Sequence, residues 1–133
     1  SVAIERGPLL FGLRIEEQWK NVKGTDKYGD YREIRPGTPW NYGILAEVLK
    51  NPATSFEVKF NDKNSHHPWN LANAPVELIT KGKRIPEWQL YNETAGPLPY
   101  STIDYLKDRP AETITLIPYG CTKLRISEFP VVQ

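Results

Sequence analysis

The sequence predicts an all-β fold, an antiparallel β-sandwich of jelly-roll type with little helix. Twelve Pro and nine Gly are spread along the 133 residues and cut the chain into pieces that are mostly too short for helices. Several of these pieces alternate apolar and polar residues with the period of two that is typical of strands. About eight short strands separated by turns favour a sandwich closed by antiparallel pairing.

Five of the expected strands lie in the first half of the chain. Residues 21–30 form a polar, Gly-containing loop between two of them. Residues 40–50 fit both helical and strand spacing, and we expect a strand because Tyr42, Ile44 and Val48 favour it. The five are residues 1–6, 9–16, 31–34, 40–50 and 56–60.

Alternation is clear in residues 56–60, 112–118 and 122–129. Residues 56–60 place Phe56, Val58 and Phe60 inward, with charged residues between them facing outward. Near the end of the chain, Leu124 and Ile126 alternate with polar residues after a turn. The remaining expected strands are residues 76–81, 112–118 and 122–129, and residues 85–90 fit either a further strand or an extended arm that carries Trp88.

Charge and apolar runs exclude some functional classes. With 17 basic and 16 acidic residues the net charge is +1, so a strongly basic nucleic-acid footprint is not expected. The longest apolar runs are too short to span a membrane. The sequence has no Met and starts at Ser1, which favours a piece of a longer protein. We expect residues 1–133 to form a single domain within it.

Residues that commonly carry chemistry do not form a recognisable motif. No carboxylate stands in a pattern that marks a catalytic acid or base, so solvated surface charge is expected. His66-His67, with Asp62 nearby, is suited to zinc but fits better as a polar loop, and residues 25–30 fit a turn better than a calcium site. A single Cys121 forms no internal disulfide and is expected to be buried. We therefore expect no metal, no cofactor and no catalytic site.

Aromatic residues near Pro, Gly or Asn are the best binding candidates. Sugars pack their C–H faces on exposed rings, while amide side chains read the hydroxyl groups. For each Trp, a place in the core or at a domain interface is the more frequent alternative. The candidate carbohydrate-binding residues are Trp40, Trp69, Asn70, Trp88, Gln89 and Tyr91.

Three stretches resemble the β-L-arabinofuranosidase-like glycoside hydrolases. Residues 5–11 (ERGPLLF) are similar to the "ERGPLVY"-type strand that follows the catalytic region in this family. Residues 38–43 (TPWNYG) resemble the "PWNY" segment of its polysaccharide-degrading bacterial members. Residues 118–125 (PYGCTKLR), with Glu128-Phe129-Pro130, resemble its closing strand pair.

The resemblance implies an accessory role without catalysis. In that family an α/α barrel carries the catalytic glutamate and a cysteine-rich zinc site, and β-sandwich domains follow it. This chain corresponds to the downstream β region, so no catalytic residue is carried over, and Cys121 does not match the family's nucleophile. The expected partners are the catalytic domain of the same parent chain and an arabinose-containing glycan, with a periplasmic or extracellular location. A self-sufficient carbohydrate-binding module is the alternative.

Overall fold

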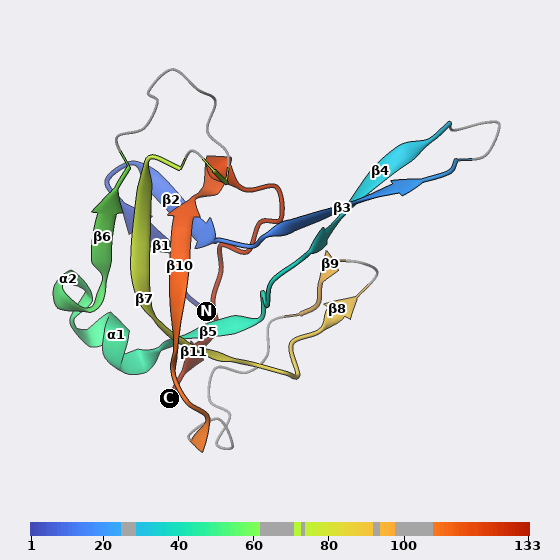
Figure 1. Ribbon diagram of the computed structural model, residues 1–133. Coiled ribbons are helices and arrows are strands. Elements are labelled where there is room, and N and C mark those ends of the chain that lie inside the picture. Colours follow the sequence, from blue (N-terminus) through green and yellow to red (C-terminus); the bar gives the residue numbers. More distant parts are fainter. Residues whose placement is uncertain (25–28, 62–70, 73, 92–93, 98–107) are drawn as a thin grey trace.

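The computed structural model confirms an all-β fold. It describes residues 1–24, 29–61, 71–72, 74–91, 94–97 and 108–133. Most of these residues lie in strands, and the two α-helices are short (Figure 1). Trp69, Asn70, the histidine pair with Asp62, and residues 25–28 of the predicted turn lie outside the described residues. The jelly-roll connectivity stays a prediction.

A seven-stranded sheet forms the body of the protein. Its order is β1-β2-β10-β7-β5-β11, and β6 pairs with β7 beside this path. Five of the neighbouring pairs are antiparallel, whereas β11 and β5 are parallel, so the sheet is mixed. The strands are β1 (Ile4–Arg6), β2 (Leu9–Leu13), β5 (Tyr42–Leu45), β6 (Glu57–Phe60), β7 (Val76–Arg84), β10 (Glu112–Pro118) and β11 (Val131–Val132).

Strand β7 is the centre of this sheet. It pairs with β10 along one side, while on the other its first half pairs with β6 and its second half with β5. We expected a strand at residues 76–81, but it continues to Arg84. Lys83 in this continuation is only 7% exposed, and its Nζ donates a hydrogen bond to the Gln133 carbonyl oxygen at 2.8 Å. The basic residues at the end of β7 are therefore part of the sheet.

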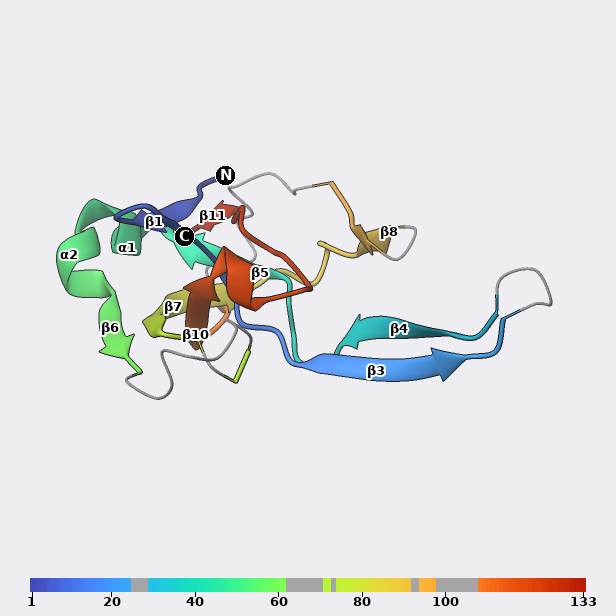
Figure 2. The same ribbon diagram turned by 90° about the horizontal axis from the view of Figure 1, so that it is seen from above.

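The sheet curls until its edge strands β1 and β6 approach one another (Figures 1 and 2). The Arg6 guanidinium at the end of β1 lies 5.2 Å from the centre of the Phe60 ring at the end of β6. The main core lies inside this curl. Its largest fully buried apolar side chains include Phe11, Ile44, Leu116 and Phe129.

The segment at residues 40–50 combines both structures that its spacing allowed. Strand β5 covers Tyr42–Leu45 and leads directly into helix α1 (Ala46–Lys50), so the strand prediction is correct only for the first part. Pro52 then starts a second short helix, α2 (Pro52–Ser55). Proline suits a first helical turn because the N–H it lacks would have no partner there.

Two hairpins lie outside the main sheet. Strands β3 (Glu17–Val22) and β4 (Tyr31–Pro36) form a long arm, and β8 (Leu90–Tyr91) and β9 (Thr94–Ala95) form a short one (Figure 1). Strand β3 was not expected from the sequence. In residues 85–90 only Leu90 belongs to a strand, so the strand alternative was wrong there. Residues 122–129 contain no strand, so that prediction was wrong as well. At the latter, a 3₁₀ turn (Tyr119–Cys121) leads into irregular backbone.

Strand β6 is present, and Val58 and Phe60 lie on the predicted core side of the sheet, since they pair with the buried Leu78 and Val76, but they are incompletely covered there. Val58 is 38% exposed and Phe60 is 63% exposed. Because β6 pairs only with β7 among the described residues, its apolar side chains lie at a sheet edge. Phe56, just before the strand, packs against the core.

We predict that Gly82→Ala destabilises the protein by about 2 kcal/mol, as overpacking at a tight contact does. A Cβ atom at Gly82 on β7 would lie 2.6 Å from the Gly43 carbonyl oxygen on β5 and 3.0 Å from Ile114 Cδ1. Urea unfolding would measure the change. Gly7→Asn is the control, since Gly7 has φ of 60° with nothing near its missing Cβ, and Asn tolerates this backbone region. An equal loss in both variants would contradict the close-approach explanation.

Candidate functional site: a groove between two hairpins

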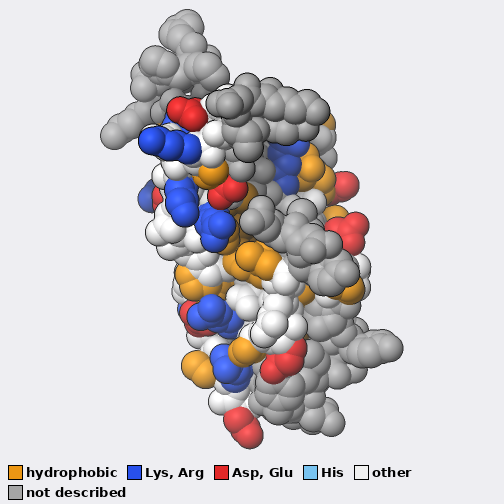
Figure 3. Space-filling model, turned by 90° about the vertical axis from the view of Figure 1, so that its right-hand side faces the viewer, with side chains coloured by type: hydrophobic (Ala, Val, Ile, Leu, Met, Phe, Trp, Pro, Cys, Tyr) orange, Lys and Arg blue, Asp and Glu red, His pale blue; other side chains and the backbone are white. Residues whose placement is uncertain are grey.

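A groove of about 650 Å³ lies between the β3–β4 arm, the β8–β9 hairpin and the segment 123–126. Figure 3 views the molecule from this side and shows hydrophobic side chains with Lys and Arg side chains among them. A volume of this size is typical of small-molecule sites, which are lined by apolar side chains with a few polar groups. Its apolar lining comprises Ile15, Ile34, Pro36, Trp40, Leu90, Ala95, Leu124 and Ile126.

A pair of tryptophans supports one side of the groove. The Trp40 ring lines the groove and meets the Trp88 ring edge-on, with centroids 5.1 Å apart and planes at 67°. Trp88 is 3% exposed, and its indole N–H donates a hydrogen bond to the Gly96 carbonyl oxygen at 3.0 Å. Trp88 therefore joins the core to the β8–β9 hairpin and fixes the position of Trp40.

Asn41 holds the backbone around Trp88. Its buried Nδ2 donates hydrogen bonds to the carbonyl oxygens of Ile85 at 2.9 Å and Trp88 at 3.2 Å. Its Oδ1 accepts a hydrogen bond from Arg84 Nε at 3.1 Å. The Ile85 N–H also donates to the Asn41 carbonyl oxygen at 2.7 Å. Because both ends of the amide are used as well, the segment after β7 is fixed although it is not a strand.

Three cations and one carboxylate line the groove. Arg35 Nη2 lies 3.5 Å from Glu33 Oε2 within the β4 strand. Lys123 Nζ lies 4.9 Å from the Trp19 ring centre on β3. Arg125 donates from Nε to the Thr122 carbonyl oxygen at 3.0 Å and lies 4.6 Å from the Tyr119 ring centre. The groove therefore combines an apolar lining with an excess of positive charge.

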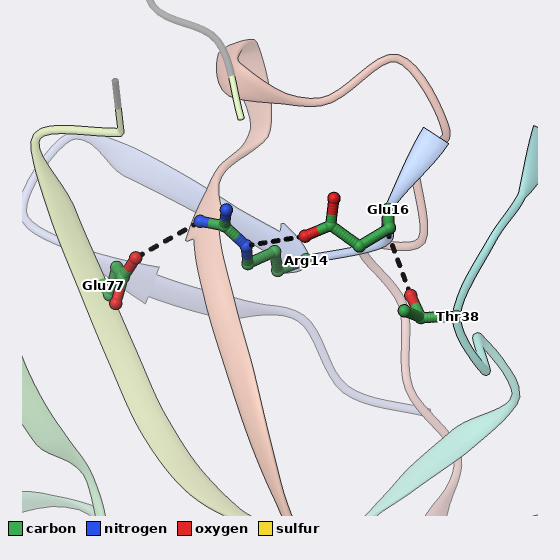
Figure 4. A network of polar contacts seen from close by, with 4 residues as sticks. All are labelled: Arg14, Glu16, Thr38 and Glu77. Atoms are coloured by element: carbon green, nitrogen blue, oxygen red, sulfur yellow. Dashed lines mark hydrogen bonds and ion pairs between the residues drawn. The ribbon is translucent and has the colours of Figure 1, made fainter. Parts of the chain in front are cut away.

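Polar contacts fix the base of the β3–β4 arm beside this groove (Figure 4). Arg14 bridges Glu77 on β7 at 3.3 Å and Glu16 at 3.5 Å. The Glu16 backbone N–H donates to the Thr38 hydroxyl at 3.0 Å, which joins the two ends of the arm. These half-exposed ion pairs add little stability, and their value lies in orientation.

The structure brings only part of the predicted binding set to this groove. Trp40 lines it, whereas Trp88 is in the core behind it. Gln89 is exposed next to Leu90, and its carbonyl oxygen accepts a hydrogen bond from the Gly96 N–H at 2.9 Å. Tyr91 lies in β8 next to Leu90, which lines the groove. Trp69 and Asn70 lie outside the described residues, so their role stays a prediction.

The sequence did not single out the groove's cations. Lys123 and Arg125 alternate with Leu124 and Ile126, and that alternation survives as exposed and half-buried positions although no strand forms. Arg35 lies almost ninety residues earlier in the chain. Only the folded arm brings these residues together, so no spacing in the sequence marks the site.

Other chemistry is sparse in the part of the chain that the structure describes. No cluster of three His, Cys, Asp or Glu residues is placed to hold a metal ion there. Cys121 is buried beside Ala74 and Ile117, as expected, and burial raises the pKa of its thiol. No described helix is long and apolar enough to cross a membrane.

No family model, curated protein or solved structure matches the chain significantly. The resemblance to β-L-arabinofuranosidase-like hydrolases is therefore carried by the three sequence stretches alone.

We predict that Asn41→Ala lowers the free energy of unfolding by about 2 kcal/mol, because the Trp88 carbonyl oxygen loses its donor in a buried place. Movement of Trp88 should also shift tryptophan fluorescence to longer wavelength. Urea unfolding followed by fluorescence measures both effects. Asn21→Ala, on the exposed β3 strand, is the matched control and should change stability by less than about 0.5 kcal/mol. Equal behaviour of the two variants would refute the supporting role of Asn41.

We also predict a loss of stability in alkali that depends on Tyr42. Burial, followed by the charge of Glu112 and the hydrogen bond to it at 3.2 Å, raises the pKa of the Tyr42 phenol above its ordinary value of 10.0. The unfolded state therefore releases this proton at a lower pH than the folded state does. The stabilisation is fully present below the unfolded pKa of about 10 and is lost as the pH rises through the folded pKa.

Unfolding free energies of the wild type and Tyr42→Phe between pH 8 and 11 test this effect. The wild type should lose more stability above about pH 10 than the variant, which has no phenol to ionise. Tyr119→Phe is the control, since it removes a phenol from the 3₁₀ turn, away from the pair of Tyr42 and Glu112. Parallel pH profiles for the wild type and Tyr42→Phe would contradict the prediction.

Proposed function

We propose that this chain is a non-catalytic accessory β domain of a polysaccharide-degrading glycoside hydrolase. In this proposal it packs on an α/α-barrel catalytic domain of the same parent chain and contacts glycan at its groove. The family assignment rests on the three similar stretches. The docking role rests on one structural observation, the apolar surface at the β1–β6 edge.

That surface exposes large side chains that a free-standing sheet edge usually avoids. Phe60 is 63% exposed and Val58 is 38% exposed, and both project from β6. Next to them a hollow of about 480 Å³ is lined by side chains of β1, α1, α2, β6 and β7. Its apolar lining comprises Ala3, Ile4, Leu49, Pro52, Ala53, Phe56, Val58 and Leu78. Such a surface suits contact with another domain.

The groove's single described carboxylate also supports a role without catalysis. Glycosidases generally need two carboxyl groups across the scissile bond. Among the described lining residues only Glu33 carries one, and it is paired with Arg35. Binding and positioning of a glycan fit this lining better than hydrolysis.

A self-sufficient carbohydrate-binding module is the second candidate, favoured by the position of Trp40 in the groove. Such modules present several rings on one open face. Trp88 is buried, so it supports Trp40 and offers no face to a sugar. The exposed apolar edge at β6 would also have no role in a free-standing module. We therefore favour the accessory domain.

The gene sequence upstream of the Ser1 codon tests the proposed family most simply. An α-helical barrel that carries the family's glutamate and cysteine cluster is the expected result. An open reading frame that begins at or close to Ser1, or a different upstream domain, would overturn the proposal. Hydrolysis of an arabinofuranoside by the isolated chain would overturn it as well.

We predict that Phe60→Ser with Val58→Thr leaves the isolated chain's stability nearly unchanged, because both side chains are already exposed. In the longer protein the same changes should weaken domain packing, seen as faster limited proteolysis between the domains and separate thermal transitions. Lys59→Ser is the matched control, since Lys59 lies on the opposite face of β6. If the double variant and the control behave alike in the longer protein, β6 is not the docking edge.

A further inference from the structure

We propose that the groove binds a saccharide that carries a carboxylate, such as a uronic acid unit. The saccharide class rests on the proposed function, whereas the preference for an anion rests on the groove's own charges. Three cations line it, and Glu33 is the one described carboxylate among them. A neutral sugar would form no ion pair with this excess of positive charge.

Two of the cations are positioned to bind an anionic ligand. Neither Lys123 nor Arg125 forms an ion pair with any residue in the described ranges. The Arg125 contacts use Nε and the face of the guanidinium, so its two terminal nitrogens have no acceptor among the described residues. The hydrogen bond to Thr122 and the Tyr119 ring hold the guanidinium in place. A fixed guanidinium with free terminal N–H groups is suited to an oxyanion.

The apolar lining suits the rest of a sugar ring. Leu124 and Ile126 alternate with the two cations along one segment, so apolar and charged groups lie next to each other in the groove. Trp40 and Leu90 face the groove from other parts of the chain, and Leu90 is 51% exposed. A pyranose has an apolar C–H face that packs on such side chains while its carboxylate reaches the cations.

The apolar lining favours a carboxylate carried on a sugar ring over inorganic phosphate. Glu33 lies 3.5 Å from Arg35, so part of the groove's positive charge is already compensated. The charge that remains is positive and would attract a phosphate as well as a uronate. Phosphate binding is therefore the competing outcome that the experiment must separate.

The test is a calorimetric titration of the full chain with trigalacturonate and with its fully methyl-esterified form. The ester keeps the sugar rings and removes the charge. We expect trigalacturonate to bind at least tenfold more tightly, and its affinity to fall in 0.5 M salt because part of the attraction is electrostatic. Equal affinities for the two ligands, or no binding of either, would overturn the proposal. Tighter binding of a sugar phosphate than of trigalacturonate would also overturn it.

Variants locate the binding. Lys123→Gln and Arg125→Gln should each weaken trigalacturonate binding at least fivefold, while Lys59→Gln on β6 should not change it. Lys123 is exposed and contacts only the Trp19 ring among the described residues, so its variant should fold normally. Thermal unfolding of each variant checks this directly. Unchanged affinity in a folded Lys123→Gln variant would overturn the assignment of this groove.

A negative titration does not affect the accessory role, which depends on the β6 edge and the upstream sequence. Conversely, an upstream region without the expected barrel would remove the accessory role even if the groove binds the acidic saccharide. The two proposals therefore fail on different measurements.

Discussion

The close approach of β5 and β7 at Gly43 and Gly82 is the constraint on which the remaining structure depends. A side chain at Gly82 would meet the Gly43 carbonyl oxygen, so only glycine lets the two strands pair at this point. This pairing allows β7 to continue past β6 and places Asn41 directly before β5. Asn41 then holds the backbone that carries Trp88, and Trp88 supports Trp40 in the groove. The groove is thus built outward from the centre of the sheet.

Much of the fold was predictable where one face of a strand is buried. Strands β2 and β10 were predicted from their apolar residues and lie in the middle of the sheet, although Gly12 and Ile117 on the other face are buried as well. Strand β3 was missed because, among the described residues, it pairs only with β4, and most of its residues are exposed, so it lacks an apolar face from which a strand could be predicted. Val58 and Phe60 show the converse, since their alternation places them on the core side, where the sheet edge leaves them exposed. Residues 40–50 fitted both strand spacing and helical spacing because they form strand β5 followed directly by helix α1.

The candidate site was less predictable, for reasons of geometry. Aromatic residues beside Pro and Asn did point to Trp40, but the same reasoning selected Trp88, whose 3% exposure places it in the core. No local pattern distinguishes the two rings, because burial depends on which segment covers them. The cations of the groove come from β4 and from the segment after the 3₁₀ turn, and only the folded β3–β4 arm brings these together. The spacing of these residues in the sequence therefore does not indicate that they lie together.

The central claim is that the edge formed by β6 and the adjoining hollow is covered by another domain of the parent protein. Hydrogen exchange of the backbone amides of β6 (Glu57–Phe60), compared between the isolated chain and the longer protein, tests it most directly. The account predicts that these amides exchange at least tenfold more slowly in the longer protein, while those of the exposed β3 strand do not change. Identical exchange rates for β6 in both proteins would contradict it.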